Sequence, residues 1–404
     1  LTIILSTLLS GCTAVWGSNG NEGGTITFGA TISITGELAE EGQYTRDGYL
    51  MAINAINRAG GITIGGKVYH LALRYYDDES SPDLAVQLYK QLITQDNVDF
   101  LLGPYSSSLT EAVAPLAEKY HLPLVEGNGA AESIFNHGYH YIFGVQSPAK
   151  DYLTGIIAVV LAKDPGASTL AVLGAEESFS QEVKAGAIAY AQSHGMRVVY
   201  QGNYPTNTQD LSAQLQAIKA LHPDILLGAG HVQDTLLMAK QAQDICVSPK
   251  AMGFSVGPAS LIFRPYLQSK ADYIFGASQW TSALKYVGID LWKTPQAYTT
   301  AFRVQFPQYT EIPYQAAESS ASVIAFQAAL NHAGSLDPSA VRTALAHLDI
   351  MTFYGPIQFD QRGLNIYKPM AVEQLQPDGG QYTVYPFDVA ERPALYPMPP
   401  CKQP

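Results

Sequence analysis

The residues of this sequence best suited to ligand chemistry are three consecutive serines, Ser106 to Ser108. They follow the apolar run "VDFLL" and a Gly103-Pro104 break, and a helix-like pattern begins near Leu109. The unpaired N–H groups and positive dipole end of a helix N-terminus attract anions, and hydroxyls add directed donors. Ser108 and Glu111 also have the spacing of a capping box. We therefore expect Ser108 to cap the helix and Ser106 or Ser107 to face a ligand, most simply a carboxylate.

A second pattern suits catalysis. Gly253-Phe254-Ser255-Val256-Gly257 fits the G-x-S-x-G turn that carries the nucleophile of α/β hydrolases, and Asp337 with His347 follows in the expected order. The strand before Ser255 is weak, because residues 249–252 supply only two apolar positions after a proline and a lysine. We expect Ser255 to lie on a cleft loop and to bind rather than attack, with serine hydrolysis as the remote alternative.

Cofactor, metal and nucleic-acid sites have little support. "GNGAAE" has two glycines of a dinucleotide fingerprint but Glu132 in place of the third, and no P-loop, CxxC, HExxH or EF-hand spacing occurs. His137 and His140 lack a third ligand at metal spacing, so we expect them at the surface. A net charge of −12 without Lys/Arg runs argues against nucleic acid.

The elements that must position these residues repeat from Thr25 onward, where β-branched or apolar strands alternate with amphipathic helices. This alternation predicts right-handed βαβ crossovers and parallel sheets covered on both faces. A second series follows residues 144–152, and a length of 404 residues suits two domains. The predicted fold is α/β, with two doubly wound parallel-sheet lobes.

Ligands of such sheets bind beyond the carboxyl ends of the strands. The strand before the serines is followed by a second apolar strand that ends in the Gly-rich "EGNGAAES". We therefore expect two adjacent loops to present hydroxyls and bare backbone amides, including that of Gly129, to one cleft.

The first residues resemble an export signal. Leu1–Leu9 is apolar but too short for a stable membrane anchor, and Leu9-Ser10-Gly11-Cys12 resembles a bacterial lipobox. We expect residues 1–12 to be the end of a signal peptide, Cys12 to carry a lipid and residues 13–24 to form a flexible tether. A buried strand ending in cysteine is the alternative.

Two further cysteines, Cys246 and Cys401, remain. In an exported protein such a pair can form a disulfide, and two isolated buried thiols are the alternative that sequence leaves open.

Four longer stretches follow one another in a familiar order: "ATISITGELAEEGQYTRDGYLMAINAINRAGGI", "LRYYDDESSPDLAVQLYKQLI", "VDFLLGPYSSSLTEAVAPLAEKYHLPLVEGNG" and "GSLDPSAVRTALAHLDIMTFYGPIQFDQRG". From Thr25 to about Phe387 the chain resembles the type I periplasmic solute-binding proteins of ABC importers, above all their branched-chain amino acid group. The resemblance implies two lobes, joined by three hinge crossovers, that close on a ligand. The first lobe would contain residues 25–146 and 277–348, and the second residues 147–276 and 349–404.

The resemblance also implies ligand-binding positions, which fall at Glu41, Tyr44, Ser106, Ser107, Asn128, Gly129, Ala130, Phe179, His231 and Ser255. The family's carboxylate-binding serine matches Ser107 or, with a shift of one residue, Ser106. Ala130 stands where the amino acid binders have a threonine. Ser255 stands where they have the acid that pairs with the ligand ammonium.

The missing acid bears on the ligand, because a buried ammonium needs a charge partner. We expect a small carboxylate, an aromatic acid, a neutral amide or an apolar acid, unless Glu41 or Glu126 supplies the charge from the first lobe. Phe179 and Trp280 allow apolar bulk at the cleft and hinge, with ordinary packing as the alternative.

The resemblance implies a monomeric, extracytoplasmic, lipid-anchored receptor without enzymatic activity or cofactor. It would close on a small solute and deliver it to an ABC permease in the membrane. A sensor of the same fold, reporting its ligand to a signalling partner, is the alternative.

Overall fold

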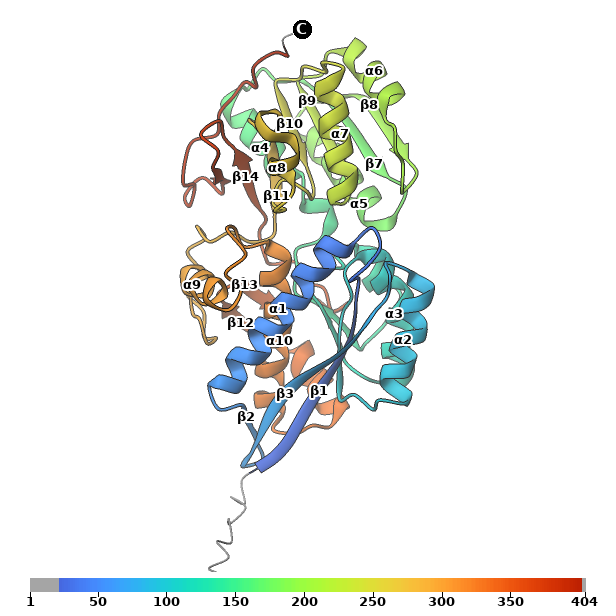
Figure 1. Cartoon of the computed structure of the whole chain (residues 1–404), viewed down its shortest axis with the longest axis vertical. Helices are drawn as coiled ribbons and strands as arrows, with labels where there is room; N and C mark the ends of the chain where they lie inside the picture. The colour runs from blue at the N-terminus through green and yellow to red at the C-terminus, as the bar shows by residue number, and fades with distance from the viewer. Residues whose placement is uncertain (1–21, 402–404) are drawn as a thin grey trace, which may run out of the picture.

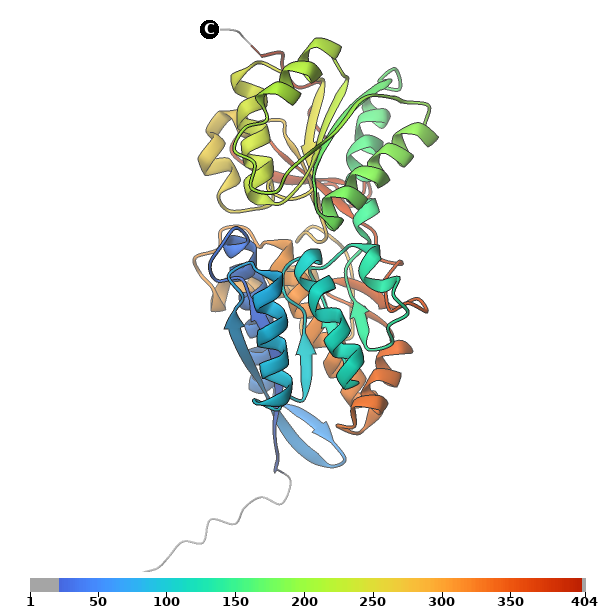
Figure 2. The same ribbon diagram turned by 90° about the vertical axis from the view of Figure 1, so that its right-hand side faces the viewer.

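The computed structural model describes residues 22–401, which form two lobes stacked along the long axis of the molecule (Figures 1 and 2). Within these residues, the first lobe contains a six-stranded sheet of order β2-β3-β1-β4-β5-β6 and the second a seven-stranded sheet of order β15-β14-β11-β10-β9-β7-β8. Neighbouring strands are parallel except for β2 with β3, β11 with β14, and β14 with β15. The predicted α/β fold with two doubly wound lobes is confirmed.

The strands of the described residues are β1 (Glu22–Ile32), β2 (Ile62–Ile64), β3 (Lys67–Asp77), β4 (Phe100–Leu102), β5 (Leu124–Glu126), β6 (Ile142–Gly144), β7 (Thr169–Ala175), β8 (Arg197–Tyr204), β9 (Ile225–Ala229), β10 (Ala251–Phe254), β11 (Phe275–Ser278), β12 (Asp349–Thr352), β13 (Gly355–Gln358), β14 (Ala371–Leu375) and β15 (Gln381–Tyr385). The α-helices are α1 (Ala39–Arg58), α2 (Pro82–Thr94), α3 (Ser107–Tyr120), α4 (Thr154–Lys163), α5 (Ser178–Ser193), α6 (Ser212–Leu221), α7 (Val232–Asp244), α8 (Phe263–Leu267), α9 (Pro295–Gln305), α10 (Tyr314–Ala333) and α11 (Pro338–Ala346). Three short 3₁₀ turns are η1 (Glu132–Phe135), η2 (Ala149–Asp151) and η3 (Gln268–Ala271). Among residues 22–401, no helix combines the length and apolar character needed to cross a membrane.

Local sequence explains why these elements form where they do. Strands β4, β5 and β6 are buried along their whole length, as expected for parallel strands covered by helices on both faces. Helix α2 begins after Ser81, whose side chain accepts a hydrogen bond from the amide of Leu84, and Pro82 occupies the first helical position. These signals fix the strand ends and helix starts that face the other lobe.

Three crossovers join the lobes: one from β6 to η2, one leaving β11, and one between Leu364 and Ala371. Leu364 still pairs with Gly144 at the edge of the first sheet. The β12–β13 hairpin packs on the first lobe, because Phe353 at its tip stacks on Tyr298 of α9 with 4.1 Å between ring centroids. The third crossing therefore lies beyond the expected boundary between residues 348 and 349.

Trp280 follows the second crossover but packs inside the first lobe. Its indole donates a hydrogen bond to the carbonyl oxygen of Phe353, and its ring meets Tyr298 edge-on. Only 2% of its surface is exposed. Ordinary core packing, the alternative considered for Trp280, is what the structure contains.

The three crossovers are tied together by Gln279. Its side chain accepts a hydrogen bond from the Ser147 amide and donates one to the Ser147 carbonyl, each at 3.0 Å. Lys368 of the third crossover donates to the carbonyl of Gln279 and accepts from the Ser147 hydroxyl through its own carbonyl. The Lys368 ammonium lies 4.3 Å from the centre of the Tyr354 ring, and burial lowers its pKa to about 7. The hinge is thus one buried polar network.

We expect Gln279→Leu to lower the free energy of unfolding by about 2 to 3 kcal/mol, because it leaves both backbone groups of Ser147 buried without partners. Denaturant unfolding followed by circular dichroism measures this loss. Gln296→Leu is the matched control, since Gln296 donates to two carbonyls from an exposed position. Equal losses for the two variants would contradict the role given to Gln279.

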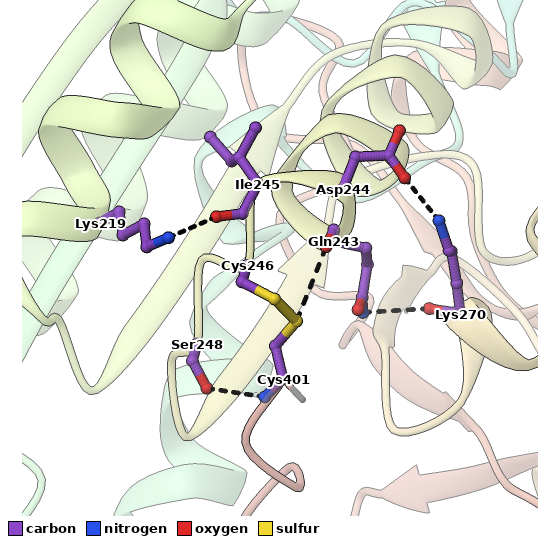
Figure 3. Close-up of a disulfide and its surroundings, with 8 residues drawn as sticks. All are labelled: Lys219, Gln243, Asp244, Ile245, Cys246, Ser248, Lys270 and Cys401. Atoms are coloured by element: carbon purple, nitrogen blue, oxygen red, sulfur yellow. Dashed lines mark hydrogen bonds and ion pairs between the residues drawn. A yellow bond between two sulfur atoms is a disulfide. The ribbon is translucent and has the colours of Figure 1, made fainter. Parts of the chain in front are cut away.

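The end of the second lobe is fastened by a disulfide. After β15 the chain runs back over the lobe, and Cys401 is bonded to Cys246, which lies just beyond α7 (Figure 3). The Cys401 amide also donates to the Ser248 hydroxyl at 3.2 Å. The pairing that the sequence left open is therefore formed, whereas Cys12 and the predicted lipobox lie outside the described residues.

Candidate functional site

The serine segment begins α3 at the carboxyl end of β4. Ser106 has extended backbone angles and is the N-cap, while Ser107 and Ser108 lie in the first helical turn. The predicted capping box is wrong, because the helix begins before Ser108 and Glu111 instead accepts a hydrogen bond from the Ser133 hydroxyl. The Ser107 hydroxyl accepts from the Ala131 amide at 3.0 Å, which leaves its own hydrogen available to donate.

The loop after β5 is organised by Glu126. One oxygen of this buried carboxylate accepts hydrogen bonds from the amides of Asn128 and Gly129, and the other accepts from the Thr110 hydroxyl at 2.6 Å. Burial raises the pKa of Glu126 to about 7. The predicted bare amide at Gly129 is wrong, because Glu126 binds it. Both oxygens of Glu126 already accept hydrogen bonds from the protein, so this carboxylate is not available to pair with a ligand ammonium.

Asn128 is oriented by a short chain of hydrogen bonds. The Ser319 hydroxyl donates to the Gln315 carbonyl at 2.6 Å, so its single hydrogen is used and its oxygen accepts from Asn128 Nδ2 at 2.9 Å. Asn128 Oδ1 is then buried without a partner. Ala130 is fully buried, and its carbonyl accepts from the Ala149 amide.

Glu41 and Tyr44, in the first turns of α1, reach across to the second lobe. Glu41 Oε1 accepts from the Val232 amide at the start of α7 at 3.1 Å, whereas Oε2 is buried without a partner. Burial raises the pKa of Glu41 to about 7. The Tyr44 hydroxyl donates to Glu40 and accepts from the Leu261 amide at 3.2 Å. Both residues therefore hold the lobes together.

Aromatic rings from the two lobes meet beside these groups. Phe179 of α5 stacks on His231 with 5.4 Å between ring centroids, and Tyr152 meets Phe179 edge-on at 5.0 Å. The Tyr105 hydroxyl lies 3.0 Å from His231 Nδ1. Sequence reasoning missed Tyr105 and Tyr152, although Tyr105 directly precedes the serines and Tyr152 closes the segment at the first crossover.

The rim of this region is acidic. A cavity of about 360 Å³ is lined by Glu37 from the first lobe and by His231 and Asp234 from the second. Burial, followed by the charge of Asp234, raises the pKa of Glu37. Glu177 Oε1 lies 3.9 Å from His231 Nε2. This arrangement favours the approach of a group with positive charge.

Ser255 is held inside the second lobe. The preceding β10 is a fully buried strand, so the prediction of a weak strand was wrong; a short strand suffices where helices cover it. The Ser255 hydroxyl donates to the carbonyl of Gly230 and accepts from its amide, at 2.9 and 3.0 Å. Asp337 caps α11 of the first lobe, and His347 bonds the Thr343 carbonyl there. The three members of the hydrolase pattern are therefore engaged separately, in different lobes.

His137 and His140, the histidine pair considered for a metal site, are exposed. Within residues 22–401, no group of three or more His, Cys, Asp or Glu side chains is arranged to hold a metal ion.

Comparison with known proteins gives the family. The family model for periplasmic binding proteins matches residues 25–381. The Leu/Ile/Val-binding protein homolog 8 of Brucella abortus (strain 2308) is 25% identical over 384 residues, which cover 90% of this chain and 91% of that protein.

Solved structures share the fold at lower identity. The branched-chain amino acid transporter substrate binding protein LivJ from Streptococcus pneumoniae, in complex with isoleucine, aligns with a TM-score of 0.74 at 20% identity, covering 92% of this chain and all of that one. A solute-binding protein of an ABC transporter from R. palustris, in complex with benzoate, gives 0.74 at 17% identity, covering 92% and 97%. The chain belongs to the periplasmic binding protein family, in the branched-chain amino acid group of its type I members.

Proposed function

We propose that this protein is an extracytoplasmic substrate-binding protein of an ABC importer, which captures a small amino acid or carboxylate between its lobes and performs no chemistry. The observation that carries the proposal is the meeting of ligand-suited residues from both lobes: Glu41 with Val232, and Tyr105 with His231. A solute held there touches both lobes and so favours the closed state, which a permease can recognise.

The character of the site supports such a solute. Ser106 and Ser107 lie at the N-terminus of α3, where a carboxylate is stabilised by the helix dipole and by hydroxyl donors. Phe179, His231 and Tyr105 offer ring surface for an apolar body. The similar structures with isoleucine and with benzoate represent the two ligand classes to be compared, aliphatic amino acids and aromatic acids.

We further propose that the mature protein is a monomer outside the cytoplasm, anchored by a lipid on Cys12. The disulfide between Cys246 and Cys401 supports this location, because such bonds persist in oxidising compartments. Metabolic labelling with a palmitate analogue, compared between the native chain and Cys12→Ala, tests the anchor.

Thermal unfolding of the full chain carrying Cys12→Ala tests solute capture. We expect leucine, isoleucine, valine, phenylalanine, benzoate or 4-hydroxybenzoate to raise the melting temperature, because a ligand at 100 times its Kd stabilises the folded state by about 2.7 kcal/mol. Failure of all six to stabilise the protein would contradict the proposal in this form. Turnover of a 4-nitrophenyl ester that is lost in Ser255→Ala would instead support the hydrolase alternative.

A further inference from the structure

We propose that the first lobe carries a further binding site, outside the region between the lobes, and that its ligand is an amphipathic amine, an apolar body with one ammonium group. The site is a cavity of about 750 Å³ lined by helices α10 and α11, strand β12 and the loop 289–293. The inference does not depend on the proposed function, because every wall of this cavity belongs to the first lobe.

The cavity is remote from the residues that face the second lobe. Helix α10 begins at Tyr314, which lies within electrostatic reach of Glu41, whose charge contributes to raising the pKa of this tyrosine. The same helix lines the cavity only from Ile324 to His332. At about 1.5 Å per residue, Ala328 in the middle of this stretch lies about 21 Å along the helix from Tyr314. A ligand in the cavity therefore does not touch the groups between the lobes.

The floor of the cavity is apolar. Ile324, Ala344 and Leu348 line it with only 3%, 5% and 7% of their surface exposed. The lining positions of α10 are 324, 327, 328, 331 and 332, which share one face of the helix over about 12 Å. Sites for small molecules have volumes of about 300 to 1,000 Å³. The space therefore suits a body such as one aromatic ring with a short chain.

The loop that forms one wall is held in place by Asp290. Its carboxylate accepts hydrogen bonds from the amides of Trp292 and Phe353, at 2.8 and 2.6 Å. This arrangement leaves Ile289 and Leu291 at the rim of the cavity with 75% and 39% of their surface exposed. Apolar side chains so exposed gain free energy when they cover an apolar body.

The polar groups at the helix ends favour a positive ligand. His347 Nδ1 lies 2.9 Å from the Thr343 carbonyl, which can only accept, so the neutral ring carries its hydrogen on Nδ1 and offers Nε2 as an acceptor. Asp349 lies two residues further and is exposed, and within residues 22–401 its carboxylate has no hydrogen-bond or ion-pair partner. The last turns of α10 and α11 also line the cavity, which places the negative ends of both helix dipoles there.

Lys293 also lines the cavity and opposes this charge. Asp290 in the same loop offsets it, because the Asp290 carboxylate accepts from backbone amides, which carry no net charge. An anion would therefore meet Asp349 and two helix C-termini, and an uncharged molecule would leave the Asp349 carboxylate without a counter-charge. An ammonium can pair with Asp349 and donate a second hydrogen to His347 Nε2.

Histidine signals can locate the ligand. The full chain carrying Cys12→Ala would be labelled with ¹³C in its histidine rings, assigned through single His→Gln variants, and titrated with 2-phenylethylamine. We expect the signals of His332 and His347 to shift and that of His194, exposed in the second lobe, to stay unchanged. His231 reports on the region between the lobes. A shift of His231 without shifts of His332 and His347 would overturn the proposal.

Matched compounds and charge variants test the ammonium in the same titrations. We expect 2-phenylethylamine to bind about fivefold tighter than 2-phenylethanol, and 3-phenylpropanoate to leave the signals of His332 and His347 unshifted. Asp349→Asn should weaken only the amine, by about fivefold, the upper range for an ion pair at an exposed acid. Lys293→Gln should strengthen it about twofold. Asp83→Asn is the control, an exposed acid in the first turn of α2 that should change no affinity.

Filling the cavity tests its shape. Ala328→Phe places a ring against the floor of the cavity, and we expect it to abolish the shifts caused by the amine while the circular dichroism spectrum stays unchanged. Ala297→Phe is the size control, because it adds the same ring at an exposed position of α9 outside the lining. Binding that persists in Ala328→Phe would contradict the assignment of the cavity.

The remaining outcomes are equally decisive. Equal affinities for the amine and the alcohol, or an unchanged affinity in Asp349→Asn, would overturn the ammonium assignment. Unshifted signals of His332 and His347 at about 10 mM amine would reject the site, since so weak a complex lies beyond a millimolar Kd. None of these results bears on solute capture between the lobes, which the thermal panel tests.

Discussion

Replacing Cys401 with serine is expected to lower the free energy of unfolding of the second lobe by about 4 to 5 kcal/mol. The disulfide joins residues separated by 155 positions, so breaking it frees a large loop in the unfolded chain, and the loop-entropy model gives a loss of this size. It also frees the last described segment, which runs back over the lobe. Urea unfolding at constant temperature, followed by circular dichroism, measures the change.

If the loss of stability comes from the disulfide alone, every way of breaking this bond should have the same effect. Cys246→Ser alone and the double variant should lose the same stability as Cys401→Ser, and reduction of the native chain should reproduce it. A double variant clearly less stable than either single one would show that a thiol contributes beyond the bond. A loss below about 1 kcal/mol would mean that tail packing, not the cross-link, holds the segment.

Gly103→Ala is expected to damage both the first lobe and ligand binding. A Cβ at this position would lie 1.8 Å from Glu126 Oε2, so the carboxylate must move. It cannot move alone, because Thr110, Asn128 and Gly129 all donate to it. We expect a loss of about 3 to 5 kcal/mol, within the range for disruption of a buried network, and no measurable binding by the six compounds of the thermal panel.

Gly166→Ala serves as the control for this substitution. Gly166 is exposed, and its nearest neighbour is the Asp164 side chain, 3.1 Å from the added carbon. Its stability should stay within about 0.5 kcal/mol of the native chain, as for surface positions in general. A Gly103→Ala variant that binds normally would show that the Glu126 network does not shape the site.

The two-lobe frame was predictable from the sequence because it depends on local patterns. Alternating strands and helices, with Gly and Pro breaks between them, suffice to predict doubly wound sheets. The third crossing was not predictable in this way. The sequence of the β12–β13 hairpin has no pattern that assigns it to either lobe. The hairpin packs on the first lobe because the Phe353 ring contacts the rings of Tyr298 and Trp280 there.

The site was predictable as a location rather than as a set of roles. Predicted strand ends indicated Ser106 and the loop that contains Glu126, and the family resemblance indicated Glu41. Only hydrogen-bond partners distinguish a carboxylate with an available oxygen from one that binds its own loop. The same holds for Ser255, whose hydroxyl serves Gly230. Such partners depend on distances between segments remote in sequence, which composition and spacing do not contain.

Each lobe is made of segments that are separated in the sequence by the other lobe, and this fixes the order in which the two lobes can be completed. Each lobe is completed by a segment that follows the chain's passage through the other lobe. Helix α10 and the β12–β13 hairpin complete the first lobe, and β14 and β15 complete the sheet of the second. During synthesis, β11 is therefore an exposed sheet edge of the segment 149–278. It stays unpaired until residues 371–385 have been made and β14 pairs with it. Until then, the unpaired edge of β11 can pair with other chains. If the protein folds after export across a membrane, it would need either fast folding or a chaperone to avoid such pairing. The disulfide between Cys246 and Cys401 then forms last, after the second lobe is complete.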